Sequence, residues 1–305
     1  MTDAYLDIAG LHMAVGRGRR PLPILRGVDL AVAPGEVHGL VGESGAGKSM
    51  VGRTVLGLLP PAARVTGGTV QYRGRDLLAM PVAERRALLG AKIALIPQDP
   101  MTALNPVHRI GRQVTDVLRL HLGLRQKPAL ARAEELLAAV QIREPGRVLR
   151  QYPHELSGGM RQRVLIAIAF ACDPDLIVAD EPTTALDVTV QRQILRLLKE
   201  MQGRAGTAIL FVTHDLGVVS KICDRVSVIH AGRILESGAA TEIFAAPRHA
   251  YTRALFAATP RYDRPADALH PIPPALLSAL WAEAHEADRD EADRDAADRA
   301  TEDGR

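Results

Sequence analysis

Residues 36–50, EVHGLVGESGAGKSM, decide the fold. A short apolar segment, residues 36–41, leads into a glycine-rich loop, residues 42–49, and then into residues 50–59, which are apolar enough for a buried helix. The loop matches the pattern G-x-x-x-x-G-K-[ST], in which glycines let backbone N–H groups turn inward and approach phosphate oxygens closely. The N-terminus of the following helix adds a favourable potential for anions. The stretch therefore predicts a strand, a phosphate-binding loop and a helix.

Two side chains of this loop have individual expected roles. Lys48 would reach the β- and γ-phosphates of a nucleotide, and Ser49 Oγ would ligate Mg²⁺. The other candidates for ATP binding are the remaining residues of the loop and the one after it: Gly42, Glu43, Ser44, Gly45, Ala46, Gly47 and Met50. The loop predicts nucleotide binding but does not by itself separate kinases, GTPases and motor ATPases.

A second candidate element is LIVADE, residues 176–181, in which four apolar residues precede two acids. An Asp at the carboxyl edge of a buried strand can hold Mg²⁺ through water, so Asp180 is expected opposite Ser49. Successive side chains of a strand alternate, so Glu181 would point elsewhere and could polarise a water for in-line attack on the γ-phosphate. This placement predicts hydrolysis rather than transfer to a substrate hydroxyl.

A third element, LSGGM, has the composition of a second phosphate-binding helix start. Ser157 is a natural N-cap, and the glycines after it bare backbone N–H groups. Its members are Leu156, Ser157, Gly158, Gly159 and Met160. One chain gains nothing obvious from two such sites unless they meet across a dimer.

The wider pattern is typical of an α/β fold with a largely parallel sheet. Strand-like apolar runs occur at residues 92–97, 176–179, 208–212 and 225–229, and helical stretches such as residues 188–201 alternate with them. Helical periodicity from about residue 100 to 170 predicts an inserted α-helical subdomain. The segment before residue 35 predicts short extended pieces joined by turns.

Composition excludes several classes of protein. Of the 305 residues, 47% are hydrophobic and 24% charged, which excludes a disordered or collagen-like chain. The longest apolar runs, such as residues 164–172, are far short of a membrane-spanning helix. Cys172 and Cys223 alone are too few for a disulfide scaffold or a cysteine metal cluster. Aromatic residues make up only 3%, which leaves few stacking platforms for single-stranded nucleic acid, and no nucleic-acid partner is expected.

The end of the chain differs from the rest. Residues 283–305 carry ten acidic residues and four arginines and show no apolar face, so they predict a disordered, acidic tail. Residues 263–282 are expected to form a linker or a short helix.

In their order and spacing these motifs resemble the ATP-binding subunits of ABC transporters. The resemblance covers about residues 5–260 and rests on the loop, LSGGM and LIVADE, together with PTTALD at residues 182–187 and THD at residues 213–215. It implies a P-loop NTPase domain of the ABC type over residues 1–262, using ATP and Mg²⁺. It also implies ATP hydrolysis coupled to transmembrane transport.

The resemblance also implies roles for particular residues. Ser157 and Gly159 would contact the γ-phosphate of an ATP bound by a partner's loop, so that two ATP molecules lie between two such domains. Glu181 resembles the general base, and His214 the switch histidine that contacts the γ-phosphate and the attacking water. Gln98 would sense Mg²⁺ and water and relay motion to the membrane partner. Asp187 would belong to the loop that communicates between the two sites.

Further segments resemble the peptide and nickel importers of this family. They are QDPMTALNP at residues 98–106, YPHE at 152–155, IFAAP at 243–247 and HAYTRAL at 249–255, the last two within an expected C-terminal extension at about 240–262. This branch implies a second ABC ATPase, identical or not, two transmembrane permease subunits and an extracytoplasmic solute-binding protein. It places the chain peripherally on the cytoplasmic face of the cell (inner) membrane.

Three positions depart from the pattern of the family. Val15 stands where an aromatic residue often stacks on adenine, no cysteine follows Cys223 to hold an iron–sulfur cluster, and Ala250 replaces the expected proline. The transported solute stays open, and so do two other functions: a soluble, non-transport ABC ATPase and a cassette of an organophosphonate-utilisation system. A noncatalytic adaptor is disfavoured, because the set Lys48, Ser49, Asp180, Glu181 and His214 is complete.

Overall fold

The computed structural model describes residues 4–16, 21–184, 186–259 and 271–302, with side chains described as far as residue 289. Within these ranges, six strands form a sheet in the order β10-β9-β3-β8-β7-β6. Apart from the antiparallel pair β9 and β10, neighbouring strands of this sheet are parallel. Their bounds are β3 Val37–Val41, β6 Ile93–Ile96, β7 Leu176–Asp180, β8 Ala208–Thr213, β9 Arg225–His230 and β10 Arg233–Ala239. All residues of β3 and β8 are buried, as expected of strands covered on both faces.

The parallel strands are joined by helices, as the alternation of apolar runs predicts. The glycine-rich loop leads from β3 into α1 (Lys48–Leu56), α8 (Val188–Ala205) lies between β7 and β8, and α9 (Leu216–Ile222) lies between β8 and β9. The carboxyl ends of β3, β7 and β8 therefore lie side by side, and the loops that follow them converge at one edge of the sheet.

A second, antiparallel sheet is formed by the N-terminal part of the chain. Its order is β2-β1-β4-β5, with bounds β1 Leu6–Val15, β2 Leu22–Val32, β4 Ala63–Tyr72 and β5 Arg75–Asp76. The extended pieces expected before residue 35 are two strands, β1 and β2, which are longer than expected at ten and eleven residues. Register shifts within the β1 pairings interrupt the simple alternation of apolar and polar residues, which is why the sequence pattern understates these strands.

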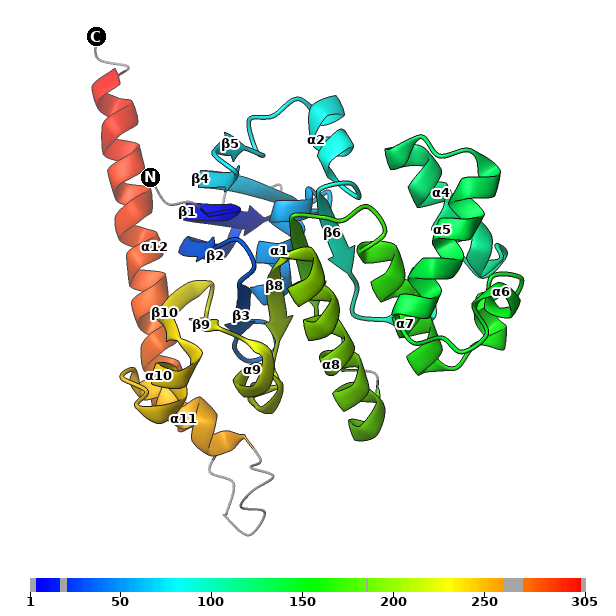
Figure 1. Cartoon of the computed structure of the whole chain (residues 1–305). Coiled ribbons are helices and arrows are strands. Elements are labelled where there is room, and N and C mark those ends of the chain that lie inside the picture. The colour runs from blue at the N-terminus through cyan, green and yellow to red at the C-terminus, as the bar shows by residue number, and fades with distance from the viewer. Residues whose placement is uncertain (1–3, 17–20, 185, 260–270, 303–305) are drawn as a thin grey trace.

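The predicted helical block forms a lobe beside the parallel sheet (Figure 1). It contains α3 Pro100–Ala103, α4 Ile110–Leu122, α5 Gln126–Ala139, α6 Pro145–Val148, a 3₁₀ turn at Pro153–Glu155 and α7 Gly158–Ala169. A short helix, α2 (Val82–Leu88), precedes β6. In α4 the buried residues Ile110, Val114 and Leu118 recur every four positions, so one face of this helix packs inward.

In the described part of the chain, β10 is followed by α10 (Ala240–Ala245), α11 (Ala250–Ala258) and α12 (Pro274–Glu302). Over residues 274–302 the structure differs from the expected linker or short helix and disordered tail, because α12 is one continuous helix through both segments. Part of that predicted linker, residues 263–270, lies outside the described residues. Two physical features explain the helix. Proline favours its first turn, and no glycine or proline interrupts the alanine-rich sequence from residue 275 to 302.

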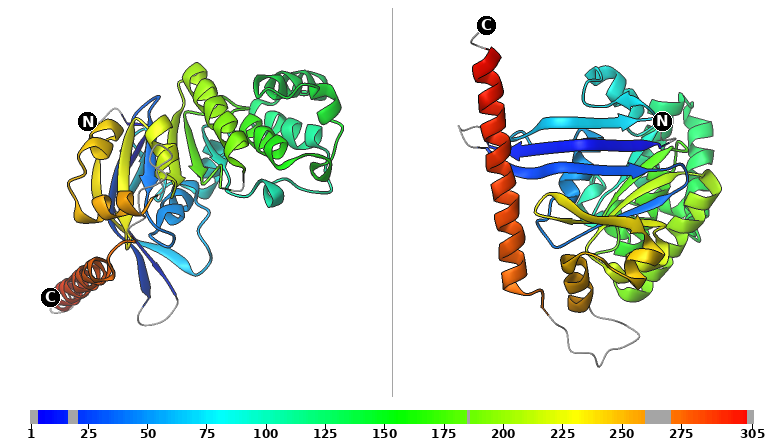
Figure 2. Two further views of the ribbon diagram at one scale, coloured as in Figure 1. Left: turned by 90° about the horizontal axis from the view of Figure 1, so that it is seen from below. Right: turned by 90° about the vertical axis from the view of Figure 1, so that its left-hand side faces the viewer.

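The first half of α12 is fixed to the rest of the molecule. Leu280 and Ala284, one turn apart, are buried, and Asp288 forms a 2.8 Å ion pair with Arg26 of β2. Figure 2 shows α12 running across the direction of the strands of the antiparallel sheet. In the described part of the chain, no helix combines the length and apolar character needed to cross a membrane.

Candidate functional site

The glycine-rich loop between β3 and α1 is held by close backbone contacts. A Cβ on Gly42 would lie 2.1 Å from Ile229 O in β9, so no larger residue fits there. Gly47 has a φ of 104°, and a Cβ on it would lie 2.9 Å from Leu25 Cδ2 of β2. Gly232 N donates to Ala46 O at 3.0 Å. The loop is thus fixed between β9 and β2, while Ser44 and Gly45 are exposed at its rim.

Lys48 is the first residue of α1 and turns back across the loop. Its Nζ donates to Gly42 O at 2.9 Å and to Glu43 O at 2.8 Å. Burial lowers the pKa of Lys48, although the charges of Glu181, Asp180 and Glu43 oppose that shift. A buried ammonium group at the floor of a loop of backbone N–H groups suits an anion such as phosphate. Met50, two residues along, is half-buried and packs in the core beneath the loop.

Ser49 and Asp180 meet at the carboxyl edge of the parallel sheet. Ser49 Oγ donates to Asp180 Oδ1 at 2.9 Å, which joins the start of α1 to the end of β7. Burial raises the pKa of Asp180, and the neighbouring charge of Glu181 raises it further, against the hydrogen bond from Ser49. A hydroxyl and a carboxylate side by side form the kind of oxygen donor set that Mg²⁺ takes, so these residues fit the predicted metal.

Glu181, directly after β7, has polar partners from its own loop and from two distant segments of the chain. Its Oε2 accepts from Gln98 Nε2 and from Thr184 Oγ1, both at 3.0 Å, and its Oε1 lies 3.0 Å from His214 Nδ1. The backbone of Glu181 has a φ of 45°, an uncommon conformation for a non-glycine residue, and its N–H donates to Val212 O at 2.8 Å. The structure therefore brings the three predicted catalytic residues, Glu181, Gln98 and His214, into one cluster.

LSGGM and Asp187 lie at the starts of α7 and α8. Ser157 is exposed and caps α7, its Oγ accepting from Met160 N at 3.3 Å, while Leu156 is buried. A Cβ on Gly159 would lie 2.8 Å from Val190 Cγ1 of α8, so the glycine allows the two helices to pack closely. Asp187 caps α8, its Oδ1 accepting from the N–H groups of Thr189 and Val190. The hydrogen bonds of Ser157 and Asp187 are thus local ones that begin their own helices.

Comparison with known proteins identifies the group to which this arrangement belongs. The ABC transporter family model matches residues 25–184. This chain belongs to the ABC transporter family. The model of the oligopeptide/dipeptide transporter C-terminal region matches residues 235–283, which confirms the predicted peptide-importer branch.

Relatives and solved structures agree with this assignment. A probable peptide ABC transporter ATP-binding protein of Sinorhizobium fredii is 47% identical over 279 residues, covering 91% of this chain and 83% of the relative. The dipeptide transport ATP-binding protein DppD of Bacillus subtilis is 44% identical over 280 residues, covering 90% and 84%. A dimeric ATP-binding cassette in a post-hydrolysis state, bound to ADP and Pi, matches with a TM-score of 0.69 at 26% identity, covering 77% of this chain and 98% of that one.

The predicted fold class, a P-loop NTPase of the ABC type with a helical subdomain, is thereby confirmed, as is ATPase activity. Of the departures noted in the sequence, Val15 is the last residue of β1 and pairs with Leu22 and Ala63, so it belongs to the antiparallel sheet. Ala250 occupies the first turn of α11 after the N-cap His249, a position where proline would equally fit.

Sequence reasoning missed two residues that contact the site. Thr184 lies three residues after Glu181 and donates a hydrogen bond to its carboxylate. A hydroxyl side chain so close in sequence to the acid was the signal that could have identified it. Tyr251 of α11 bonds Glu43 of the phosphate loop across 208 residues of sequence, a separation at which no local pattern gives a signal.

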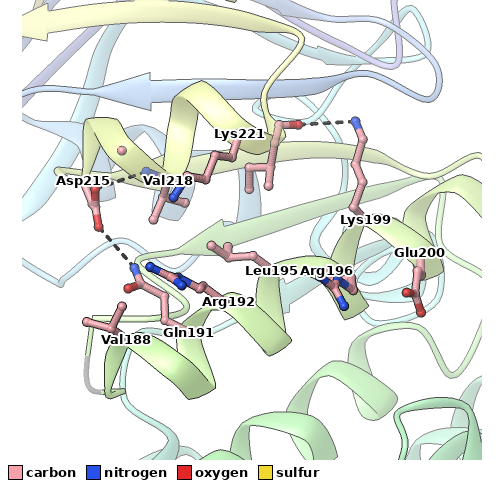
Figure 3. Close-up of a pocket in the computed structure, with 12 residues that line it drawn as sticks. Val188, Gln191, Arg192, Leu195, Arg196, Lys199, Glu200, Asp215, Val218 and Lys221 are labelled. Carbon is pink, nitrogen blue, oxygen red and sulfur yellow. Dashed lines mark hydrogen bonds between the residues drawn. The ribbon is translucent and has the colours of Figure 1, made fainter. Parts of the chain in front are cut away.

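A groove with a volume of about 710 Å³ lies between α8 and α9, beside the segment that carries His214 (Figure 3). Asp215 caps α9 through Val218 N, and it accepts from Gln191 Nε2 of α8 at 3.2 Å. On the other side of the groove, Lys199 Nζ donates to Ile222 O at 3.3 Å. These contacts join α8 to α9 and so fix the backbone immediately after His214.

Proposed function

We propose that this chain is the ATP-hydrolysing subunit of an importer for peptides or a related small solute of the dipeptide, oligopeptide or nickel class. The observation that carries the proposal is the cluster around Glu181, which lies next to the Ser49–Asp180 pair and the phosphate loop. The names of the relatives, which specify peptide and dipeptide transport, support the class of solute. The family match argues against the organophosphonate and non-transport alternatives.

In this proposal the phosphate loop and Lys48 hold the β- and γ-phosphates of ATP. Ser49, Asp180 and Gln98 would hold Mg²⁺, which when bound neutralises charge on the phosphate oxygens. Supporting this, Ser49 Oγ and Asp180 Oδ1 are already in contact, and Gln98 is bonded to Glu181 beside them.

Glu181 acts as the general base. An attacking water gives its proton to the carboxylate as its oxygen bonds to the γ-phosphorus, and the bond from that phosphorus to the bridging oxygen of ADP breaks. Glu181 Oε1 has one partner in this structure, His214 Nδ1, so this oxygen keeps a free lone pair that can accept from the attacking water. Gln98 and His214 then orient the carboxylate and the water.

The LSGGM segment, residues 156–160 and called the signature below, completes a second chain's site. Ser157 is exposed at the start of α7 and its bonds are local, which leaves its helix N-terminus available to a γ-phosphate held by a partner. Asp187 lies at the start of the neighbouring helix, where it would communicate between the two sites. The partners would be a second ABC ATPase, two permease subunits and, indirectly, an extracytoplasmic solute-binding protein, with this chain on the cytoplasmic face of the membrane.

Two experiments test the proposal. In the first, the purified chain is assayed for Mg²⁺-dependent ATP hydrolysis and nucleotide binding alongside Lys48→Ala, with circular dichroism to verify folding. Lys48→Ala should lose nucleotide affinity because the buried ammonium is removed, and unchanged binding would contradict the assignment of the loop.

The second experiment tests the transport role. The tagged chain is purified from detergent-solubilised native membranes, and the proteins recovered with it are identified by mass spectrometry. Recovery of two multi-span subunits supports the importer. Recovery of the chain alone, or with ribosomes or nucleic acid, contradicts it.

A further inference from the structure

Tyr251, which lies in the C-terminal region, contacts the phosphate loop directly. Tyr251 is fully buried, yet its hydroxyl lies at the loop, where it donates to Glu43 Oε2 at 3.2 Å and accepts from Glu43 N at 3.4 Å. Both bonds are made to one residue, the second of the loop. The hydroxyl therefore fixes both the backbone and the side chain of Glu43.

Glu43 is in turn linked to the lysine that would hold the phosphates. Lys48 Nζ donates to the carbonyl oxygens of Gly42 and Glu43. Gly42 is confined by its approach to Ile229 O, so the chain segment that positions Lys48 has a rigid first residue and a second residue held by Tyr251. The Tyr251 hydroxyl is thus two contacts away from the ammonium group.

Tyr251 is itself held firmly in place. At the start of α11 the N–H groups of Arg248 and His249 donate to the Glu236 carboxylate of β10 at 2.7 and 3.0 Å, and His249 caps the helix by accepting from Tyr251 N. The tyrosine ring lies 4.6 Å from the ring of His230, centroid to centroid. These contacts fix the ring independently of its hydroxyl.

The same cluster reaches α12. Trp281 packs edge-on against His230 at 5.9 Å and lies over the guanidinium of Arg26, which pairs with Asp288. His230 Nδ1 also lies 3.7 Å from Glu43 Oε2. A continuous layer of side chains therefore connects both C-terminal helices to the loop.

Burial of the ring does not require the hydroxyl, because phenylalanine would fill the same volume. The hydroxyl instead has a specific partner, Glu43. Burial and the nearby charge of Glu43 raise the pKa of Tyr251, so the hydroxyl stays protonated and can donate. A hydroxyl that donates to a residue of the phosphate loop holds that loop in position.

We propose that Tyr251 is a positioning residue of the ATP site, through which the C-terminal region holds Glu43 and pre-organises the phosphate loop for nucleotide. The inference rests on the proposed function of the loop as the ATP site. It adds that ATP affinity depends on α11, an element that lies outside the motifs of the nucleotide-binding domain.

The test is Tyr251→Phe in the full chain, which removes the hydroxyl and keeps the ring. The expected result is a three- to tenfold rise, roughly, in the Kd and KM for ATP, the size expected for one or two lost hydrogen bonds. The kcat should change less than about twofold, because Glu181 and its partners are untouched.

Tyr72→Phe is the matched control. Tyr72 is a buried tyrosine of β4 whose hydroxyl donates to the Asp175 carboxylate, so its loss removes a comparable bond away from the loop. If Tyr72→Phe shifts the Kd for ATP as much as Tyr251→Phe does, or if neither variant shifts it, the inference is overturned. Failure of the wild-type chain to bind ATP would instead contradict the proposed function.

A double-mutant cycle identifies the partner. Glu43→Ala removes the carboxylate that accepts from Tyr251, so the effect of Tyr251→Phe on Kd should be smaller in that background than in the wild type. Equal effects in both backgrounds would show that the tyrosine does not act through the Glu43 carboxylate, and that part of the inference would be overturned.

Discussion

Glu181 shows how much of the chemistry depends on one backbone position. Its uncommon positive φ turns the chain directly after β7, and the side chain meets Gln98, Thr184 and His214 there. Gln98 and His214 come from distant segments, and Thr184 lies three residues along the same loop. Gln98 and Thr184 bond Oε2 and His214 lies at Oε1, so both oxygens of the carboxylate are held in place.

At this scale we predict that Glu181→Gln retains ATP binding and loses turnover. The amide preserves the shape of the side chain but cannot take a proton from water, so kcat should fall by about 10²–10⁴-fold. Steady-state ATPase measurements with a separate nucleotide-binding assay test this. Glu84→Gln, which changes an exposed carboxylate on α2, is the control. Near-normal turnover in Glu181→Gln would contradict the assignment of Glu181 as the general base.

His230 predicts a pH dependence of stability. Burial lowers its pKa below 6.5, although the Glu43 charge opposes the shift and His249 adds to it. As pH falls below about 6.5, the unfolded chain takes up this proton first, so stability that is present above that pH is lost. The free energy of unfolding should drop between about pH 7.5 and about pH 5.5, and the drop should be smaller in His230→Gln.

Urea unfolding at the two pH values is the measurement for His230. His154→Gln, at an exposed histidine, is the control and should show the same drop as the wild type. An equal drop in His230→Gln and the wild type would mean that other groups cause the dependence.

At the scale of elements, α7, α8 and α9 begin with side-chain caps, whereas α1 begins after Gly47 without one. Ser157 starts α7, Asp187 starts α8 and Asp215 starts α9, each accepting from backbone N–H groups of the first turn. The same residues belong to the motifs that mark the family. Their positions are therefore constrained by helix formation as well as by any role in dimer communication or catalysis.

We predict that Asp187→Ala lowers the free energy of unfolding by about 0.5–2 kcal/mol, because two N–H groups at the start of α8 lose their acceptor. Asp187→Ser, which keeps an N-cap oxygen, should lose much less. Chemical denaturation of the wild type, Asp187→Ala and Asp187→Ser measures the three free energies of unfolding. Equal stability of the alanine variant and the wild type would show that water replaces the cap.

At the scale of the whole molecule, the phosphate loop and the LSGGM segment, residues 156–160, lie on different parts of the fold. The phosphate loop and Glu181 lie at the carboxyl edge of the parallel sheet, whereas the signature begins α7, which packs with the helical lobe. Figure 1 shows this lobe beside the sheets. The proposed dimer would bring each signature to the partner's loop.

We predict that Glu181→Gln forms a dimer only when Mg²⁺ and ATP are present, measured by light scattering after size exclusion. Adding Ser157→Asp should prevent the dimer, because aspartate keeps the helix cap but repels a γ-phosphate. The double variant should unfold at the same denaturant concentration as its parent. A dimer that forms regardless of Ser157→Asp would rule out contact between the signature and the partner's phosphate.

Part of the fold could be predicted from the sequence, because the residues that determine it are neighbours in the chain. Consecutive apolar residues in β7 and β8, and the glycines of the loop, have few alternative structures, and the predicted strands and helical block are present. The length of the strands in the antiparallel sheet and the full extent of α12 were not predicted. In β1 the register shifts hide the alternation, and α12 is anchored by contacts with a strand more than 250 residues away in sequence, as the Arg26–Asp288 pair shows.

The sequence by itself determined the family and the candidate residues of the site, because motif spacing reflects the local geometry of a loop, a strand end and a helix start. Only the tertiary structure decided what those residues contact. Thr184 beside Glu181, and above all Tyr251 on Glu43, depend on how distant segments pack. Such contacts arise from the summed packing of the whole chain, and for that reason the link between the C-terminal helices and the phosphate loop becomes visible only in three dimensions.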